Sequence, residues 1–327
     1  MMHQIAQALP ECDVWYTPYY GDPLIEKLAH HGWLEFSVLG GKHRARATAY
    51  LQHHGLRLDP GGVAHDYDLV VTCSDLIIPK NVRRRKIVLV QEGMTDPENF
   101  MFHLVKHLRL PRYLASTSTT GLSGLYEKFC VASEGYRQLF IRKGVPPDRL
   151  VVTGIPNFDN AAQYRHNDFP HRHFVLVATS DTRETFKFDN RKRFLQRACA
   201  IAAGRPMIFK LHPNEIFARA AREIRACVPE ATIYQEGNVH HMIANCDVLI
   251  TQYSSVVYTG LALQKEVHSC FDLEQLRALA PIQNGGTSAH NIAAVCRELL
   301  SRPAVMVPSA WPGRPPLAPD RRKAFAA

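Results

Sequence analysis

Short runs of apolar residues recur along the chain and alternate with stretches in which apolar residues return every three or four positions. Runs of four or five residues rich in valine, isoleucine and leucine, such as KIVLV at 86–90, predict strands that are buried on both faces. The periodic stretches between them predict amphipathic helices. Because strands and helices that alternate in this way form parallel sheets, the pattern predicts an α/β fold.

The expected elements divide into short strands and longer helices. The strands are predicted at 13–16, 66–73, 86–90, 129–132, 150–153, 174–178, 207–209, 231–234, 248–251 and 265–271. The helices are predicted at 2–9, 23–31, 44–54, 134–143, 190–203, 216–227, 239–245 and 289–300, and another is expected after a pair of serines at 254–255.

The pattern breaks near the middle of the chain, at Gly154 and Pro156, which mark the expected crossing between two domains. With 327 residues the chain is long enough for two domains of ordinary size. We therefore expect a Rossmann-like first domain at 1–155, a Rossmann-like second domain at 156–305 and a cleft between them. The remainder, 306–327, is rich in Pro, Arg and Ala and is expected to be partly disordered.

The first domain opens with a predicted helix at 2–9, ahead of its first predicted strand. A Rossmann-like domain normally begins with a strand and a glycine turn before its first helix. We therefore expect the usual first strand to be missing, because the chain begins late through a misassigned start or a deletion.

One candidate site follows the predicted strand at 248–251, where Ser254 and Ser255 precede a helical pattern. Either serine is expected to act as the N-cap of that helix. Unpaired backbone N–H groups at a helix start bind anions, and ligands of parallel sheets bind at the carboxyl ends of the strands. The alternative is a capped helix with no ligand.

A second strand end carries basic residues. Lys210 and His212 alternate at the end of the predicted strand at 207–209, so their side chains can point the same way, and Pro213 ends the strand. A lysine and a histidine beside a helix start suit a diphosphate, although a histidine before proline is otherwise an ordinary turn residue. The two strand ends together are more specific than either one alone.

The motifs at these strand ends, KLHPNE at 210–215 and TQYSSVVYTGLALQKEV at 251–267, resemble the carboxyl-terminal domain of GT-B transferases that build bacterial surface polymers. The nearest resemblances are to CDP-glycerol glycerophosphotransferases of the teichoic-acid type and to capsule, sialyl- and Kdo-transferases. The segment at 129–159 is similar to the same group and to non-hydrolysing UDP-N-acetylglucosamine 2-epimerases. The resemblance spans roughly 88–270 and implies that the second domain binds a nucleotide-activated donor.

The predicted strand at 86–90 ends in Gln91, Glu92 and Gly93, and an acid followed by a glycine at a strand's carboxyl end is well placed to face a cleft. In the resemblance it matches the acid-acid-Gly motif of sialyl- and Kdo-type transferases, which implies that Glu92 is the general base. It also matches a glutamate-glycine segment of the epimerases. Gln91 departs from the transferase motif, and the histidine that teichoic-acid enzymes tend to carry here is absent. A solvated turn residue is therefore the alternative for Glu92.

The loop after the predicted strand at 174–178 contributes further candidates. In the resemblance this loop approaches the donor, which implies contacts from Thr179 and Ser180 and a phosphate contact from Arg183, for which a surface arginine is the alternative. Asp66 and Asp68 are expected to be turn residues, because the further ligands of a hard-metal site are not evident. We therefore expect no metal and no cofactor, the nucleotide-activated donor being a substrate.

Composition and charge narrow the expected partners. The net charge of +9, with 17 histidines, suits an acidic substrate or an anionic membrane surface, and without a recognisable nucleic-acid-binding module we expect no nucleic-acid partner. The eight cysteines form no CxxC pair and indicate reduced thiols. No apolar run approaches the ~20 residues that cross a bilayer, and no signal peptide is evident. We expect a cytoplasmic protein, free or peripheral at the inner membrane face.

Together these observations predict a metal-independent inverting glycosyltransferase or glycerophosphotransferase of capsule, lipopolysaccharide or teichoic-acid-type polymer synthesis. Its donor is a nucleotide sugar or CDP-glycerol, and its acceptor is a saccharide or a lipid-linked acceptor. Lys210, His212, Ser254 and Ser255 would hold the donor phosphates, and Glu92 and His212 would be catalytic.

Two alternatives stay open at this point. One is an isomerase like the UDP-N-acetylglucosamine 2-epimerases; Tyr253, Ser254 and Ser255 stand where an epimerase has an Asp-Ser-Gly-Gly type turn, which favours the transferase. The other is a degenerate, non-catalytic protein that binds a nucleotide, which the apparently missing first strand and Gln91 both suggest.

Overall fold

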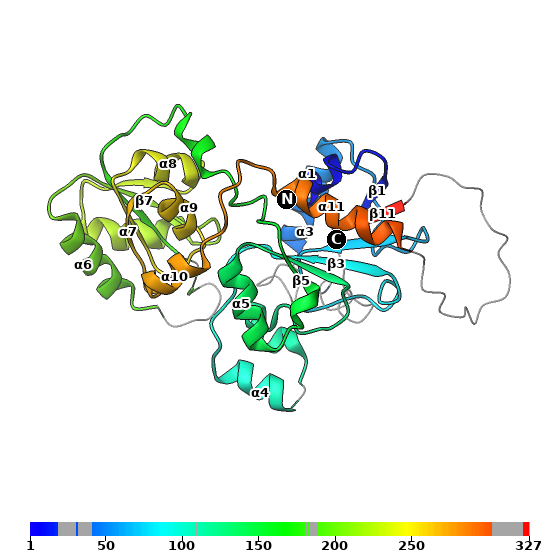
Figure 1. The fold of residues 1–327 in the computed structure, drawn as a ribbon. Helices are drawn as coiled ribbons and strands as arrows, with labels where there is room; N and C mark the ends of the chain where they lie inside the picture. Colours follow the sequence, from blue (N-terminus) through cyan, green and yellow to red (C-terminus); the bar gives the residue numbers. More distant parts are fainter. Residues whose placement is uncertain are drawn as a thin grey trace. The chain divides into compact units, whose positions relative to one another are not determined.

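The computed structural model describes residues 1–18, 31, 41–108, 110–180, 182–183, 189–302 and 323–326. The chain forms two compact units, unit 1 (Met1–Asn157 with Gly286–Ala327) and unit 2 (Phe158–Gly285). Each unit holds one sheet, and every strand pair in the two sheets is parallel (Figure 1). The predicted α/β fold with two Rossmann-like domains is confirmed, while the cleft between them stays a prediction.

Within the described residues, the sheet of unit 1 has six strands, and its two longest apolar runs form adjacent strands whose residues are almost all buried. Its order is β1 (Asp13–Tyr16), β11 (Lys323–Ala326), β2 (Leu69–Thr72), β3 (Lys86–Val90), β4 (Lys128–Val131) and β5 (Leu150–Val152). The helices of this unit are α1 (Met2–Gln7), α3 (Gly41–His53), α4 (Phe100–Leu108), α5 (Glu134–Lys143) and α11 (Ser288–Ser301), with short 3-10 segments η1 (Arg112–Thr119) and η2 (Pro147–Arg149).

A segment from the end of the chain lies inside this sheet. β11 pairs with β1 on one side, where Asp13 is opposite Lys323, and with β2 on the other, where Leu69 is opposite Ala324. Residues 323–326 therefore lie between β1 and β2. The tail at 306–327 was expected to be partly disordered; 323–326 form this strand, and 303–322 fall outside the described residues.

Helix α11 belongs to unit 1 and not to the second domain, so the predicted boundary of 156–305 is wrong at its far end. Arg297 of α11 donates to the Ala8 carbonyl at 2.6 Å and pairs with Glu11, and Lys86 donates to the Leu299 carbonyl at 2.8 Å. Figure 1 shows the orange α11 beside the blue α1. An amphipathic pattern indicates that a helix needs a partner but not which one, so this return across the whole chain was not predicted.

The sheet of unit 2 has five strands in the order β10 (Glu266–His268), β9 (Val248–Thr251), β6 (Val175–Ala178), β7 (Met207–Lys210) and β8 (Thr232–Tyr234). Its helices are α6 (Arg191–Ala202), α7 (Phe217–Cys227), α8 (Val239–Asn245), α9 (Val257–Ala262) and α10 (Leu273–Leu279), with the 3-10 segment η3 (Ala161–Arg165). Apart from α10 and η3, which were not predicted, these elements agree with the predicted ones to within a few residues at each end. The predicted helix at 23–31 falls, except for residue 31, outside the described residues.

The main core of unit 2 lies between its sheet and two helices. Phe194 and Leu195 of α6 and Ile224 of α7 pack with buried residues of β6, β7 and β9, including Val177 and Phe209. These two helices cover one face of the sheet. The loops that follow β9, β6 and β7 leave the sheet at the carboxyl ends of these strands.

Candidate functional site

Three adjacent strands of unit 2 bring the predicted donor residues to one edge of the sheet. Ala178, the last residue of β6, is paired with Lys210 of β7 on one side and with Thr251 of β9 on the other. The loops that begin at Thr179, Leu211 and Gln252 therefore leave the sheet side by side. The sequence predicted this convergence, because parallel strands end at the same edge.

Glu215 holds the loop after β7 against the loop after β6. Its buried carboxylate accepts the backbone N–H of His212 at 2.9 Å and the hydroxyl of Thr179. The Arg191 guanidinium donates to the other carboxylate oxygen of Glu215 and lies 3.3 Å from the carboxylate of Asp189. Backbone and side-chain donors on both sides thus converge on one buried acid.

The same network reaches the loop after β9 and helix α7. Asp189 accepts a hydrogen bond of 2.9 Å from the side-chain amide of Gln252, and it lies 3.5 Å from Arg183. Arg183 donates to both carboxylate oxygens of Glu223, at 2.9 and 3.0 Å. The paired charges therefore link all three loops to the two helices that cover the sheet.

Some polar atoms at this edge are buried and have no hydrogen-bond partner among the residues that the structure describes. They are the hydroxyls of Ser180 and Thr251, the amide oxygen of Gln252 and one terminal nitrogen of Arg191. Each of these residues is more than nine-tenths buried. Buried polar groups normally have a partner, so these atoms at the ligand-binding edge of a parallel sheet need a polar partner that the described residues do not supply. Two hydroxyls and a guanidinium suit an oxyanion.

The remaining predicted donor residues have protein partners. The Lys210 ammonium donates to the carbonyls of Leu211 and Gln235, both at 2.8 Å, and burial lowers the pKa of Lys210. The His212 ring accepts the N–H of Asn214 at 3.3 Å. Lys210 therefore joins the ends of β7 and β8, and any phosphate contact would replace one of its carbonyl bonds. Arg183 is held by two acids, as described above.

The serine turn departs from its prediction. Helix α9 begins at Val257 with Val256 as its N-cap, and no side chain accepts a hydrogen bond there, so the predicted capping role of Ser254 or Ser255 is wrong. The backbone carbonyls of the two serines accept the N–H groups of Val257 and Tyr258 instead, at 3.3 and 3.1 Å. These first N–H groups of the helix are therefore satisfied by the backbone and not by a serine hydroxyl. Both serines are half-buried beside the loops of the sheet edge.

Gln91 of unit 1 is a structural residue at the end of β3. Its side chain is buried; the amide nitrogen donates to the Gly93 carbonyl at 2.7 Å and the amide oxygen accepts the Ala132 N–H at 2.9 Å. A carboxylate can accept but cannot donate. The departure of Gln91 from the acid-acid-Gly motif is therefore explained by the bond to Gly93.

Glu92 follows as an exposed residue, and its backbone carbonyl accepts a hydrogen bond of 3.0 Å from Asn157. Although the residue is exposed, protein atoms around its carboxyl partly desolvate that group and raise its pKa. A raised pKa brings a carboxylate closer to the range in which a general base is effective at neutral pH.

We expect Gln91→Glu to destabilise unit 1 by about 2 kcal/mol, because it removes a buried donor and adds a charge between two strand ends. All three tryptophans lie outside 158–285, so tryptophan fluorescence during urea unfolding reports unit 1. The neighbouring exposed variant Glu92→Gln should stay within roughly 0.5 kcal/mol of the parent. Equal effects of the two variants would contradict the role of Gln91.

Among the described residues, no group of three or more histidine, cysteine, aspartate or glutamate side chains is arranged to hold a metal ion. Within the same residues, no helix has the length and apolar character needed to cross a membrane. Metal-independence and localisation therefore stay predictions.

Comparison with solved structures finds proteins of similar fold. The UDP-GlcNAc 2-epimerase from Neisseria meningitidis, solved with UDP-GlcNAc, superposes with a TM-score of 0.51 over 87% of this chain and 98% of its own, at 11% identity. The shared fold is GT-B. No protein-family model matches the sequence, and no curated protein matches it.

Two more distant GT-B structures were also found. The wall teichoic acid polymerase TagF gives a TM-score of 0.45 at 11% identity, over 91% of this chain and 93% of its own. HepE from Anabaena, in complex with UDP and glucose, gives 0.44 at 14% identity, over 89% and 93%. The likeness to the Neisseria structure, at 11% identity, establishes the fold and no activity.

The sequence did not reveal the residues that organise the sheet edge. Glu215 was part of the quoted KLHPNE motif but had no role, and Arg191, Asp189 and Gln252 were not singled out. The sequence feature that could have indicated these residues is the occurrence of charged side chains soon after apolar strands. A charged side chain that is buried at the edge of a sheet needs a partner. Which charges pair depends on the folded loops and cannot be read from spacing alone.

Proposed function

We propose that this chain transfers a glycosyl or glycerophosphoryl group from a nucleotide-activated donor to a hydroxyl acceptor, without a metal ion. The observation that carries the proposal is the set of buried, unpartnered polar atoms of Ser180, Thr251 and Arg191 at the carboxyl edge of the unit 2 sheet. Fixed donors of this kind stabilise the charge that grows on a departing phosphate.

In this proposal the donor diphosphate lies against Ser180, Thr251 and Arg191, with further contacts from His212 and the turn at 254–255. Because Glu215 and Asp189 already pair with Arg191, the site holds the guanidinium in place before the ligand binds. Preorganised charges of this kind need no rearrangement as the reaction proceeds.

Glu92 is the proposed general base. Its carboxylate takes the proton of the acceptor hydroxyl as the acceptor oxygen attacks. In glycosyl transfer that oxygen bonds to the anomeric carbon and a nucleoside diphosphate leaves with the electrons of the broken C–O bond. In glycerophosphoryl transfer it bonds to phosphorus and a nucleoside monophosphate leaves. Attack opposite the leaving group inverts the configuration, and the raised pKa of Glu92 supports this role.

Nucleotide binding tests the donor site through Ser180→Ala and Thr251→Val. Both changes remove buried hydroxyls that have no protein partner, so stability should be unchanged or higher. Thermal shifts by CMP, CDP, UDP and GDP would identify the base, because a ligand raises stability by mass action. The variants should weaken nucleoside diphosphate binding about tenfold, the cost of one charge-assisted hydrogen bond, and leave nucleoside binding unchanged.

The matched control is Ser118→Ala, which removes a buried hydroxyl of unit 1 that donates to the Ala115 carbonyl. This variant should lose stability and keep the parent's affinity for nucleotides. Two results would contradict the proposal. One is an equal thermal shift of the parent protein with all four nucleotides, and the other is an unchanged affinity for nucleoside diphosphates in Ser180→Ala and Thr251→Val.

An epimerase is the second candidate, because the Neisseria structure with the TM-score of 0.51 is one. The two candidates differ in their need for an acceptor. An epimerase converts a UDP-sugar alone, a transferase consumes its donor only with an acceptor present, and a non-catalytic nucleotide-binding protein does neither. Product analysis of donor incubated with and without acceptor separates the three.

A further inference from the structure

A cavity of about 610 Å³ opens in unit 1 between the loop after β2 and the segment around η1. This volume is within the roughly 300–1,000 Å³ of pockets that bind small molecules. Most of its wall is aliphatic. The aliphatic lining residues are Leu76, Ile77, Ile78, Val105, Leu110, Leu122 and Leu125. Glu92 lies between Arg83 and Val105 in the sequence but does not line the cavity, and no lining residue has a role in the proposed transfer.

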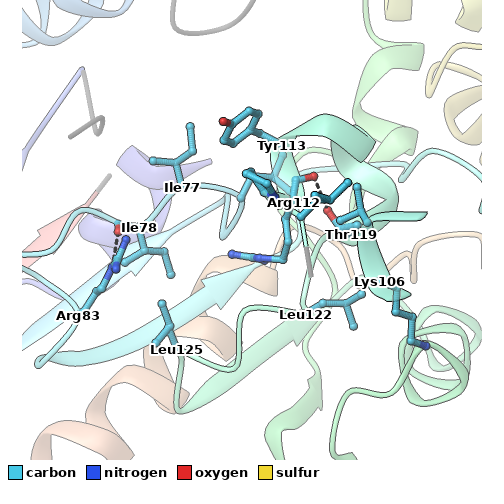
Figure 2. Close-up of a pocket in the computed structure, with 13 residues that line it drawn as sticks. Ile77, Ile78, Arg83, Lys106, Arg112, Tyr113, Thr119, Leu122 and Leu125 are labelled. Atoms are coloured by element: carbon cyan, nitrogen blue, oxygen red, sulfur yellow. Dashed lines mark hydrogen bonds between the residues drawn. The ribbon is translucent and has the colours of Figure 1, made fainter. Parts of the chain in front are cut away.

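Two guanidinium groups interrupt this apolar wall. Figure 2 shows the side chain of Arg112 extending between Ile78 and Leu125, with Arg83 on the far side of Ile78. Arg112 is anchored from behind, because it donates to the buried carboxylate of Asp75 at 2.8 Å. Its orientation is therefore fixed without a ligand.

Arg83 carries the uncompensated charge of the cavity. Its Nε donates to the Ile78 carbonyl at 2.8 Å, and it has no acidic partner among the described residues. No acid occurs among the described residues that line the cavity. The lining also includes Lys106, but its ammonium donates to the Lys143 carbonyl at 3.1 Å. The cavity is thus apolar with a net positive charge, which suits an anion attached to an apolar chain.

Exposed apolar side chains are concentrated in the segments that form the cavity, and two of them, Tyr113 and Leu125, line it. Five of the ten large apolar side chains that are exposed in the described part of the chain lie between positions 100 and 125: Phe100, Leu108, Tyr113, Leu114 and Leu125. Exposed apolar groups that gather in one place mark a contact with a protein or a membrane. Cations beside them favour the surface of an anionic bilayer, since each contributes attraction to its headgroups.

We propose that this cavity binds an anionic phospholipid of a membrane surface, with its phosphate at Arg83 and an apolar chain against Ile78, Leu122 and Leu125. The surrounding exposed side chains enter the interfacial layer of the same bilayer. This inference identifies where unit 1 meets a membrane and does not rest on the proposed transfer, because vesicle binding needs no turnover.

Vesicle flotation of the full chain tests the proposal. We expect binding to equimolar phosphatidylcholine and phosphatidylglycerol vesicles and little binding to phosphatidylcholine alone. Arg83→Ala should lower the partition coefficient about fivefold, the usual effect of one cation near an anionic surface. Leu125→Asp should lower it about tenfold or more, because it places a charge on the apolar wall. Both residues are exposed, so the fold should tolerate these changes.

Two matched control variants distinguish binding at the cavity from nonspecific binding to vesicles. Arg142→Ala removes an exposed cation on α5 of the same unit, and Ile216→Asp changes an exposed apolar residue of unit 2. Both should bind vesicles like the parent. Excess inorganic phosphate should not displace the vesicles, whereas soluble short-chain phosphatidylglycerol should. Equal losses in the control variants, release by inorganic phosphate, or equal binding to both vesicle types would overturn the proposal.

Discussion

Replacing Glu215 by alanine is expected to destabilise unit 2 by about 3–5 kcal/mol, the usual cost of breaking a buried ion pair by removing one partner. The carboxylate accepts from Arg191, from the Thr179 hydroxyl and from the backbone N–H of His212, and all three donors would lose that acceptor. Arg191 would keep its contact with Asp189 but lose half of its compensating charge. The loops after β6 and β7 would then separate.

Unit 2 contains no tryptophan, which gives this prediction a selective readout. Far-UV circular dichroism in urea should show an early transition that tryptophan fluorescence does not follow. The double variant Arg191→Ala with Glu215→Ala should be more stable than the sum of the single changes indicates, by about 1–3 kcal/mol, because the two side chains are in contact. The exposed control Glu230→Ala should change stability by less than roughly 0.5 kcal/mol. A loss below about 1 kcal/mol for Glu215→Ala would mean that the network adds little.

Replacing Glu92 by glutamine is expected to lower the rate of group transfer by about 10²–10⁴-fold, the typical contribution of a positioned general base. Glutamine keeps the size of the side chain and cannot accept a proton. Because Glu92 is exposed and lies in unit 1, the variant should fold normally and bind nucleotide in unit 2 like the parent. Initial rates with saturating donor and acceptor measure the effect.

The pH dependence gives an independent check of the same residue. A general base works only when ionised, and partial desolvation raises the pKa of Glu92. The parent rate should therefore rise with pH through a pKa above the ordinary range of glutamate, and activity should be lost as pH falls through it. Glu92→Gln should abolish this acidic limb. Retention of the limb in the variant would assign the base to another group.

The α/β class and nearly all of the described strands could be predicted, because strands buried on both faces appear as continuous apolar runs. The runs that became β3 and β9 were bounded to the residue. Pairing across long separations could not be predicted. The sequence of the four residues of β11 does not have the apolar pattern of a strand. The amphipathic pattern of α11 predicts a buried face but does not indicate that α1 packs against it.

For the candidate site, too, some features could be predicted from the sequence and others could not. Parallel topology predicted that the strand ends before His212 and before the serine turn meet at one edge. The hydrogen bond from the His212 N–H to the Thr179 hydroxyl was not predicted. The capping role of the serines was wrong, because backbone carbonyls of the turn already accept the first N–H groups of α9. The function of Glu215 was not predicted, because its three donors come from segments that only the folded loops bring together.

The location of β11 also sets an order of events during synthesis. Within the described part of the chain, the strand that pairs with β1 is β11, which is more than three hundred positions away along the chain. A ribosome that adds roughly 5–20 residues per second needs on the order of 15–65 s to make that partner. All of unit 2 is synthesised during this time. Unit 2 can therefore fold before β11 has been made and can pair with β1.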